Sequence, residues 1–219
     1  MFKKGILFLS TALCAQIYAQ DFEIGRLELS GSACKRDSDV SIIKSPDNSL
    51  ASILFSDFSA EVGQDSLHST QKRDTANCII RFPIRVDKKF RLQSYTLDYR
   101  GFSDTQLRSE TQFFTEHTLW FSVKKWLAVE PDKSLNRRFR GPASRDIDVS
   151  EKITAPAKIA NAACGKTMFI DLSLNLAASS NGANDYARIE LNTGDFSANT
   201  IAAKKQTVKI GFNLVKCTP

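Results

Sequence analysis

The chain has 219 residues, of which 42% are hydrophobic, so it is long enough to fold around its own core. Its formal net charge of +6 is too small for a nucleic-acid-binding protein to be expected. Beyond residue 20 no run approaches about 18 consecutive apolar residues, so no transmembrane segment is expected either.

The first 19 residues have the pattern of a secretory signal peptide. Lys3 and Lys4 precede an apolar stretch, and the segment ends with the small residue Ala19. Cleavage there leaves residues 20–219 with a formal charge of +4, because both lysines are removed. None of the ten asparagines in that part begins an N-x-Ser/Thr acceptor, which favours a bacterial source. We therefore expect an exported protein, either periplasmic or secreted into the extracellular medium.

The rest of the chain has a hydrophobic period of two, which is typical of strands. The alternation is clearest over residues 78–86, 167–176 and 207–217, and Pro83 should place the first of these at a sheet edge or a bulge. Weaker strand candidates occupy residues 22–29, 40–44, 50–58, 90–99, 111–125, 147–153 and 188–191. Many strands separated by turn residues predict an all-β fold, a single antiparallel β-sandwich of two sheets over residues 20–219.

Aromatic residues occupy both faces of the candidate strand at residues 111–125. Phe113 and Phe121 lie on one face, and Phe114, Trp120 and Trp126 lie on the other. One face should pack in the core. The other is either covered by a loop or forms a platform on which sugars stack, and core packing is the preferred interpretation.

The most suggestive charged stretch is residues 136–145, which we interpret as a basic loop. It holds four arginines, Arg137, Arg138, Arg140 and Arg145. Guanidinium groups pair well with phosphate, sulfate or carboxylate, so the loop is a candidate site for an anionic glycan or envelope polymer. An ordinary exposed basic loop is the alternative.

Residues for catalysis are few. Neither histidine, His68 or His117, lies in a nucleophile or metal motif, and no phosphate-binding or dinucleotide-binding loop is present, so no cofactor is expected. Asp146 and Asp148 share one face of a candidate strand, as a carboxylate pair for glycoside cleavage would require, although a solvated strand face explains them as well. We expect a non-catalytic binding or surface-associated protein. An envelope-acting hydrolase using an Asp/Glu pair and a structural or inhibitory protein-binding module are the alternatives.

Four cysteines follow the signal segment, namely Cys34, Cys78, Cys164 and Cys217. An even number in an exported chain predicts two disulfides. No Cys-x-x-Cys pair is present and no histidine lies near a cysteine, so a metal site is not expected. Four cysteines allow three pairings, and the residues alone do not choose between them.

Short motifs spread along the chain resemble those of an exported family, domain of unknown function 4360. The matching motifs are Gly31-Ser32-Ala33-Cys34, residues 55–63, Asn77-Cys78, Tyr99-Arg100-Gly101, Gly141-Pro142 and Cys164-Gly165. The resemblance implies export, and it favours the pairings Cys34–Cys78 and Cys164–Cys217. It assigns no activity. Within the motif Tyr99-Arg100-Gly101, Gly101 is expected to permit a turn with positive φ after the strand.

Overall fold

The computed structural model describes residues 22–35, 39–46, 50–63, 71–121, 134–155, 164–182, 185–191 and 206–217. These residues form thirteen strands. In chain order the strands are β1 (Phe22–Ile24), β2 (Glu28–Ser30), β3 (Val40–Lys44), β4 (Leu50–Phe55), β5 (Ser59–Val62), β6 (Arg73–Val86), β7 (Phe90–Thr105), β8 (Ser109–Phe121), β9 (Ser134–Arg140), β10 (Ala143–Thr154), β11 (Thr167–Ser180), β12 (Ala187–Glu190) and β13 (Gln206–Lys216). Within the described ranges, no helix is long and apolar enough to cross a membrane.

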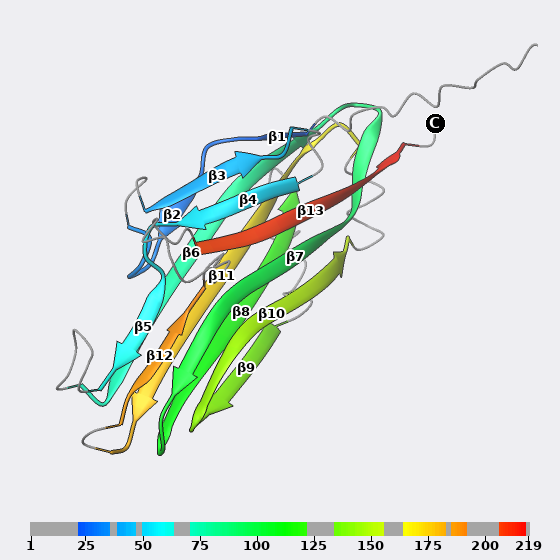
Figure 1. Cartoon of the computed structure of the whole chain (residues 1–219). Coiled ribbons are helices and arrows are strands. Elements are labelled where there is room, and N and C mark those ends of the chain that lie inside the picture. Colours follow the sequence, from blue (N-terminus) through cyan, green and yellow to red (C-terminus); the bar gives the residue numbers. More distant parts are fainter. Residues whose placement is uncertain are drawn as a thin grey trace, which may run out of the picture.

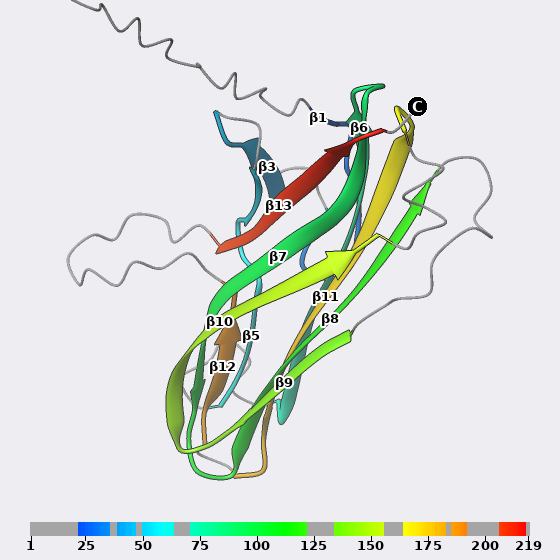
Figure 2. The same cartoon turned by 90° about the vertical axis from the view of Figure 1, so that its right-hand side faces the viewer.

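The strands form two antiparallel sheets that lie face to face as two layers (Figure 1 and Figure 2). Sheet A has the order β1-β6-β11-β8-β9, with β2 also paired to β6. Sheet B has the order β3-β4-β13-β7-β12-β5, with β10 paired to β7. The prediction of an all-β, antiparallel two-sheet architecture is confirmed.

The period-two pattern builds the core between the sheets. Along β11, buried and partly exposed residues alternate from Thr167 to Ser180 without interruption. Ile170 and Leu172 of β11 face inward and have no exposed surface, as do Leu97 and Tyr99 of β7 in the opposite sheet. Each such apolar side chain contributes about 1.5–3 kcal/mol on burial, so register is fixed most firmly along these central strands.

Three chain connections between the sheets meet at the lower end of Figure 2, joining β7 to β8, β9 to β10, and β11 to β12. Backbone hydrogen bonds link them. The N–H of Gly141 donates to the carbonyl of Ser109 (3.1 Å), and that of Asn181 donates to the carbonyl of Arg108 (3.1 Å). A Cβ at Gly141 would lie 1.8 Å from the carbonyl oxygen of Gln106, so only glycine fits. The hydrogen bond and the close packing at Gly141 fix the position of β9 at this end of the sandwich.

Two sequence predictions about local structure are wrong. Residues 136–145 are not a loop, because they form most of β9, a two-residue connection and the start of β10. Leu135 and Phe139 pack against the core from β9, which keeps this segment extended beside β8. Gly101 lies inside β7 without a positive φ; a Cβ there would meet the carbonyl oxygen of Glu190 at 2.2 Å, so close packing requires the glycine.

Pro83 lies on the outer side of β6, where the pairing with β1 gives way to the pairing with β2. The register pairs residues 84–86 with β1 and residues 79–81 with β2. Between these segments, the N–H of Gly25 donates to the carbonyl of Pro83 at 2.9 Å. The sequence predicted a sheet edge or a bulge at Pro83, and the structure shows a break between the two short edge strands β1 and β2. Because no regular strand pairing exists at this break, the missing N–H of proline removes no hydrogen bond between strands.

Both disulfides form as the family resemblance implies. Cys34 and Cys78 have Cα atoms 5.4 Å apart, and their bond ties the loop after β2 to β6. Cys164 and Cys217 have Cα atoms 6.1 Å apart. Cys164 precedes β11 of sheet A and Cys217 follows β13 of sheet B, so this second bond links the two layers.

Candidate functional site

The outer face of sheet A carries rows of outward-facing side chains that run across four strands. One row places Asn77 of β6, Asn175 of β11, Phe114 of β8 and Asn136 of β9 side by side. We call the end of the sandwich where the three connections meet the closed end. The next row toward this end comprises Thr75, Ala177, Gln112 and Arg138, and the row after that comprises Arg73, Ser179, Glu110 and Arg140. Because outward residues alternate along each strand, these rows lie over a buried layer.

Two adjoining depressions cross these rows, and together we call them the sheet A groove. One has a volume of about 360 Å³ and lies between Asn77, Phe114 and Asn175. The other has a volume of about 220 Å³ and lies between Glu110, Arg138 and Ser179. Arg73, Gln112 and Ala177 line both. The small side chain of Ala177 leaves the floor of the groove open between larger neighbours.

Side-chain amides give the groove its hydrogen-bonding character. Gln112 Nε2 donates to Asn136 Oδ1 (2.9 Å), and Asn175 Nδ2 donates to Ser173 Oγ (3.2 Å). These contacts orient the amides on neighbouring strands. An amide has two N–H donors and an oxygen acceptor, so each bond leaves groups of both kinds for a ligand.

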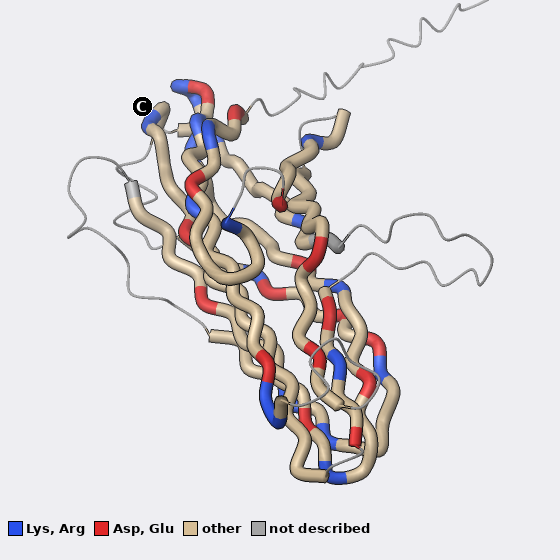
Figure 3. Tube along the Cα trace, turned by 90° about the vertical axis from the view of Figure 1, so that its left-hand side faces the viewer, with Lys and Arg blue, Asp and Glu red and all other residues tan. Residues whose placement is uncertain are grey.

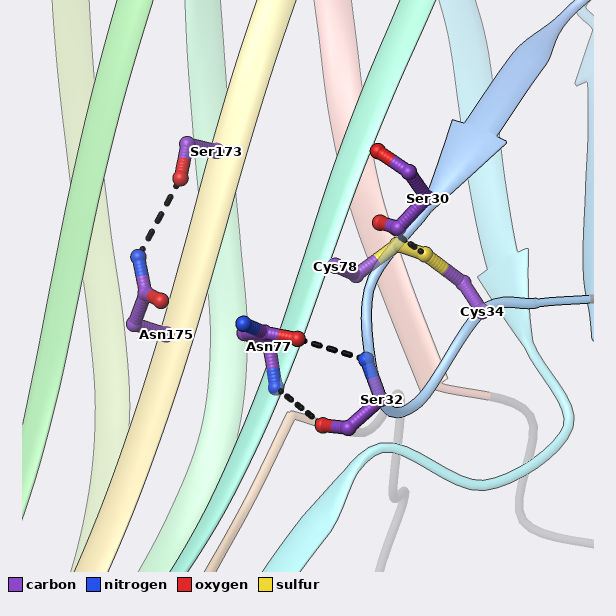
Figure 4. The surroundings of a disulfide bond; sticks show 7 residues. All are labelled: Ser30, Ser32, Cys34, Asn77, Cys78, Ser173 and Asn175. Atoms are coloured by element: carbon purple, nitrogen blue, oxygen red, sulfur yellow. Dashed lines mark hydrogen bonds between the residues drawn. A yellow bond between two sulfur atoms is a disulfide. The ribbon is translucent and has the colours of Figure 1, made fainter.

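The loop of the first disulfide positions Asn77. Asn77 Oδ1 accepts the backbone N–H of Ser32 (2.5 Å), and Ser32 Oγ accepts the backbone N–H of Asn77 (3.0 Å). In Figure 4 Asn77 lies between this loop and the strand that carries Asn175. Gly31 has a φ of 132°, and a Cβ there would lie 2.4 Å from the carbonyl oxygen of Asn77. The separated motifs Gly31–Cys34 and Asn77-Cys78 are therefore one structural unit, joined by these hydrogen bonds as well as by the disulfide that the resemblance implied.

The four predicted anion-binding arginines fall into two groups. Arg138 and Arg140 face outward beside the groove, and their Nε atoms lie 3.0 Å and 2.8 Å from the two carboxylate oxygens of Glu110. Strand alternation places Arg137 on the opposite face of β9, and it places Arg145 on the face of β10 that carries the buried Ile147. The structure also brings Arg73 of β6 to the groove, a residue that was not among the predicted anion-binding arginines.

A pair of aromatic side chains occupies the same face farther along the sheet. Trp120 of β8 and Phe169 of β11 stack with ring centroids 4.3 Å apart and planes 10° apart. The guanidinium of Arg81 lies 5.3 Å from the Trp120 ring centroid. Arg81 also donates to both carboxylate oxygens of Asp171 (2.8 Å and 2.7 Å), and these hydrogen bonds raise the pKa of Arg81 above its ordinary range. Trp126 and His68 lie outside the described residues.

The carboxylate pair considered for hydrolysis lies on the other sheet. Asp146 and Asp148 are exposed on the outer face of β10, in register with Phe102 and Arg100 of β7. His117 is buried between the sheets, with its ring edge-on to Tyr95 at a centroid distance of 6.1 Å. In the part of the chain that the structure describes, no three His, Cys, Asp or Glu side chains gather as they would around a metal ion.

These features define a disulfide-stapled antiparallel β-sandwich with a polar groove on the outer face of one sheet. The chain belongs to the family described as Domain of unknown function (DUF4360), whose model matches residues 20–207. Its sequence matches no curated protein.

Two solved structures resemble the fold at low identity. One is the enzymatically active domain of tailspike protein 4 from bacteriophage CBA120, at 10% identity and a TM-score of 0.27 over 89% of this chain. This chain covers only 20% of that tailspike chain. The other is the family 11 carbohydrate-binding module of Clostridium thermocellum in complex with a β-1,3-1,4-mixed-linked tetrasaccharide, at 8% identity and a TM-score of 0.19, covering 90% of this chain and 91% of that one.

Proposed function

We propose that this chain is an exported, non-catalytic protein that binds an anionic glycan or envelope polymer in the sheet A groove. The observation that carries the proposal is the composition of the groove, where the amides of Asn77, Gln112 and Asn175 and the ring of Phe114 line one depression. Sugar hydroxyls donate and accept hydrogen bonds, and so do amides. The C–H face of a sugar ring is apolar and packs well on an aromatic ring.

The charge of the groove near the closed end of the sandwich favours an acidic ligand. Arg73, Arg138 and Arg140 bring three positive charges to a region where Glu110 supplies one negative charge. Figure 3 shows acidic and basic residues spread along the described chain, with further basic residues near the C-terminal end of β13, at the other end of the sandwich. Guanidinium groups form strong, oriented hydrogen bonds with carboxylate, sulfate or phosphate.

The groove is built on strands and not on loops, which suits binding without rearrangement. β11 and β8 lie inside sheet A, each paired on both sides. Side chains held by regular strands lose little freedom when a ligand binds, so more of the interaction energy appears as affinity.

Two observations support the export part of this proposal. They are the signal-like segment, which lies outside the described residues, and the two disulfides. Disulfides persist in oxidising compartments, so both bonds fit a protein of the periplasm or the extracellular medium. An anionic glycan or envelope polymer is available as a partner in either place.

Arg137 and Arg145 remain candidates for a separate contact with the same anionic ligand. Both are exposed, and they lie on the two strands joined at Gly141-Pro142. Replacing both by alanine tests this contact. A ligand that extends past β9 should then bind more weakly at low salt, and unchanged binding would limit the site to the groove.

The test of the groove is calorimetric titration of residues 20–219 with oligogalacturonate, hyaluronan oligosaccharides and lipopolysaccharide. Phe114→Ala and Gln112→Ala should each weaken binding by about tenfold, the effect of losing about 1.4 kcal/mol. Phe102→Ala is the matched control, because Phe102 faces outward from sheet B. Absence of binding to every ligand, or an equal loss in Phe102→Ala, would reject the proposal.

A further inference from the structure

The aromatic pair Trp120–Phe169 lies in line with the groove. Trp120 and Phe114 belong to the same strand and face the same way, six positions apart. At about 3.4 Å per residue, they are about 20 Å apart along β8. Thr118 and Glu116 of β8 lie between them, beside Asp171 and Ser173 of β11. A continuous outward strip of polar side chains therefore joins the groove to the pair.

The two ends of this strip differ in charge. The groove end has three arginines and one glutamate. Near the pair, Arg81 contacts the carboxylates of Asp171 and Glu28, and Arg85 lies 3.9 Å from the carboxylate of Glu23, so acidic side chains outnumber basic ones there. Glu116 adds a further negative charge between the two ends. An acidic sugar would be repelled from the aromatic end, whereas a neutral sugar would not be repelled and could pack its apolar face against the aromatic pair.

We infer that Trp120 and Phe169 form a second subsite, which stacks a neutral sugar of the same ligand chain. This inference rests on the proposed function of the groove. The ligand is then an extended oligosaccharide that lies along β8 and β11, with an acidic unit beside Arg73 and Arg138 and a neutral unit on the aromatic pair. A polymer in which acidic and neutral sugars alternate fits the strip better than a uniform polyanion.

A purely structural role for the pair is the alternative, since stacked cross-strand aromatics stabilise sheets. Such a role would affect unfolding but would not make affinity depend on ligand length. The length dependence of binding therefore separates the two interpretations.

The experiment titrates wild type, Trp120→Ala, Trp120→Phe and Phe114→Ala with hyaluronan oligosaccharides from the disaccharide to the decasaccharide. Hyaluronan alternates an acidic and a neutral sugar, and oligogalacturonates of equal length serve as uniformly acidic probes. Wild-type affinity should rise with hyaluronan length until the chain reaches Trp120. Trp120→Ala should lower affinity for the longest oligosaccharides by about tenfold and leave the shortest unchanged, whereas Phe114→Ala should weaken both.

Trp120→Phe keeps an aromatic ring at the position and should retain most of the gain with length. Thermal melts of all variants show whether each is folded. In the contrary outcomes, long hyaluronan oligosaccharides bind while Trp120→Ala lowers the affinity for short and long ones equally, or changes neither affinity. Either result would reject the second subsite and leave the proposed binding in the groove intact. If neither series binds wild type, both the subsite and the acidic-glycan groove are rejected.

Discussion

Asn77 and Ser32 hold each other through two hydrogen bonds, in which each residue offers its side chain to the backbone N–H of the other (Figure 4). The bonds measure 2.5 Å to Asn77 Oδ1 and 3.0 Å to Ser32 Oγ. The neighbouring disulfide Cys34–Cys78 closes the same loop covalently. Because Asn77 also lines the groove, the loop connects the stability of the fold to the shape of the binding surface.

Asn77→Ala should therefore reduce both stability and binding, whereas Ser32→Ala should mainly reduce stability. Each change removes a solvent-exposed hydrogen bond, and water can replace the lost partner of the backbone N–H, so the cost should be about 0.5–1 kcal/mol. Urea denaturation measures the first effect and titration with an acidic oligosaccharide the second. Equal binding losses in the two variants would show that Asn77 acts on the ligand only by way of the loop.

Gly31→Ala tests the backbone requirement of the same loop. The residue has a φ of 132°, and its Cβ would lie 2.4 Å from the carbonyl oxygen of Asn77. We expect a loss of about 1–3 kcal/mol in the free energy of unfolding, the range for a residue held in an unfavourable backbone region. Gly211→Ala is the control, since its Cβ would come no closer than 3.3 Å to a neighbour. Equal stability of Gly31→Ala and wild type would contradict the loop geometry.

The two disulfides should contribute similar amounts of stability. The linked cysteines are separated by 44 and 53 residues along the chain. Loop-closure entropy in the unfolded state then gives about 4 kcal/mol for each bond. The double variants Cys34→Ser/Cys78→Ser and Cys164→Ser/Cys217→Ser are compared by urea denaturation. Thiol titration of unreduced, denatured residues 20–219 should find no free thiol, and finding any would contradict the pairing.

The strands that the sequence predicted most clearly are those in which every inward residue is apolar. In β11 the inward positions from Met168 to Leu176 are all apolar, so the strand was evident from residues alone. In β9 an arginine, Arg137, occupies the inward position between Leu135 and Phe139, which hid the alternation and made the segment look like a loop. The cysteine pairing came from the family resemblance, because residue spacing does not rank the three possibilities.

The groove could not be predicted from the sequence for a different reason. Asn77, Gln112 and Asn175 are far apart in the chain, and they come together only because β11 lies between β6 and β8. Strand order and register depend on the packing of the whole core, which no local pattern records. Alternation did place Phe114 and Trp120 on one shared face of the strand, but it did not show whether that face is the outer one.

Tyr99 should make the fold sensitive to alkaline pH. Burial raises the pKa of the Tyr99 hydroxyl above its ordinary value of about 10, and the nearby Glu151 carboxylate raises it further. The folded protein therefore keeps this proton at a pH where the unfolded chain has lost it. The stabilisation is fully present below about pH 10 and is lost as the pH rises toward the folded-state pKa.

Tyr99→Phe removes this titration and should make the decline of stability above about pH 10 shallower than in wild type. Urea denaturation at several pH values between about 9 and 11 measures the slope. Parallel slopes for wild type and Tyr99→Phe would contradict the prediction.

Glu110 should limit the affinity of the groove for acidic ligands. Its carboxylate lies 3.0 Å from Arg138 and 2.8 Å from Arg140, so it offsets one of the positive charges that face the ligand. Glu110→Gln removes that negative charge and keeps a hydrogen-bond acceptor beside both guanidiniums. We expect acidic oligosaccharides to bind several-fold more tightly at low salt, because exposed charges interact over about 10 Å at 0.1 M ionic strength.

The gain should shrink as salt is added, since screening weakens exposed charges first. Asp146→Asn makes the same change of net charge on the outer face of sheet B, where it should leave affinity nearly unchanged. Titration with hyaluronan oligosaccharides at low and high salt compares the two variants. An equal gain in both variants would assign the effect to the net charge of the whole protein. Weaker binding by Glu110→Gln would contradict the prediction. It would mean that the carboxylate orients Arg138 and Arg140, and that this orientation contributes more to affinity than the charge that the carboxylate neutralises.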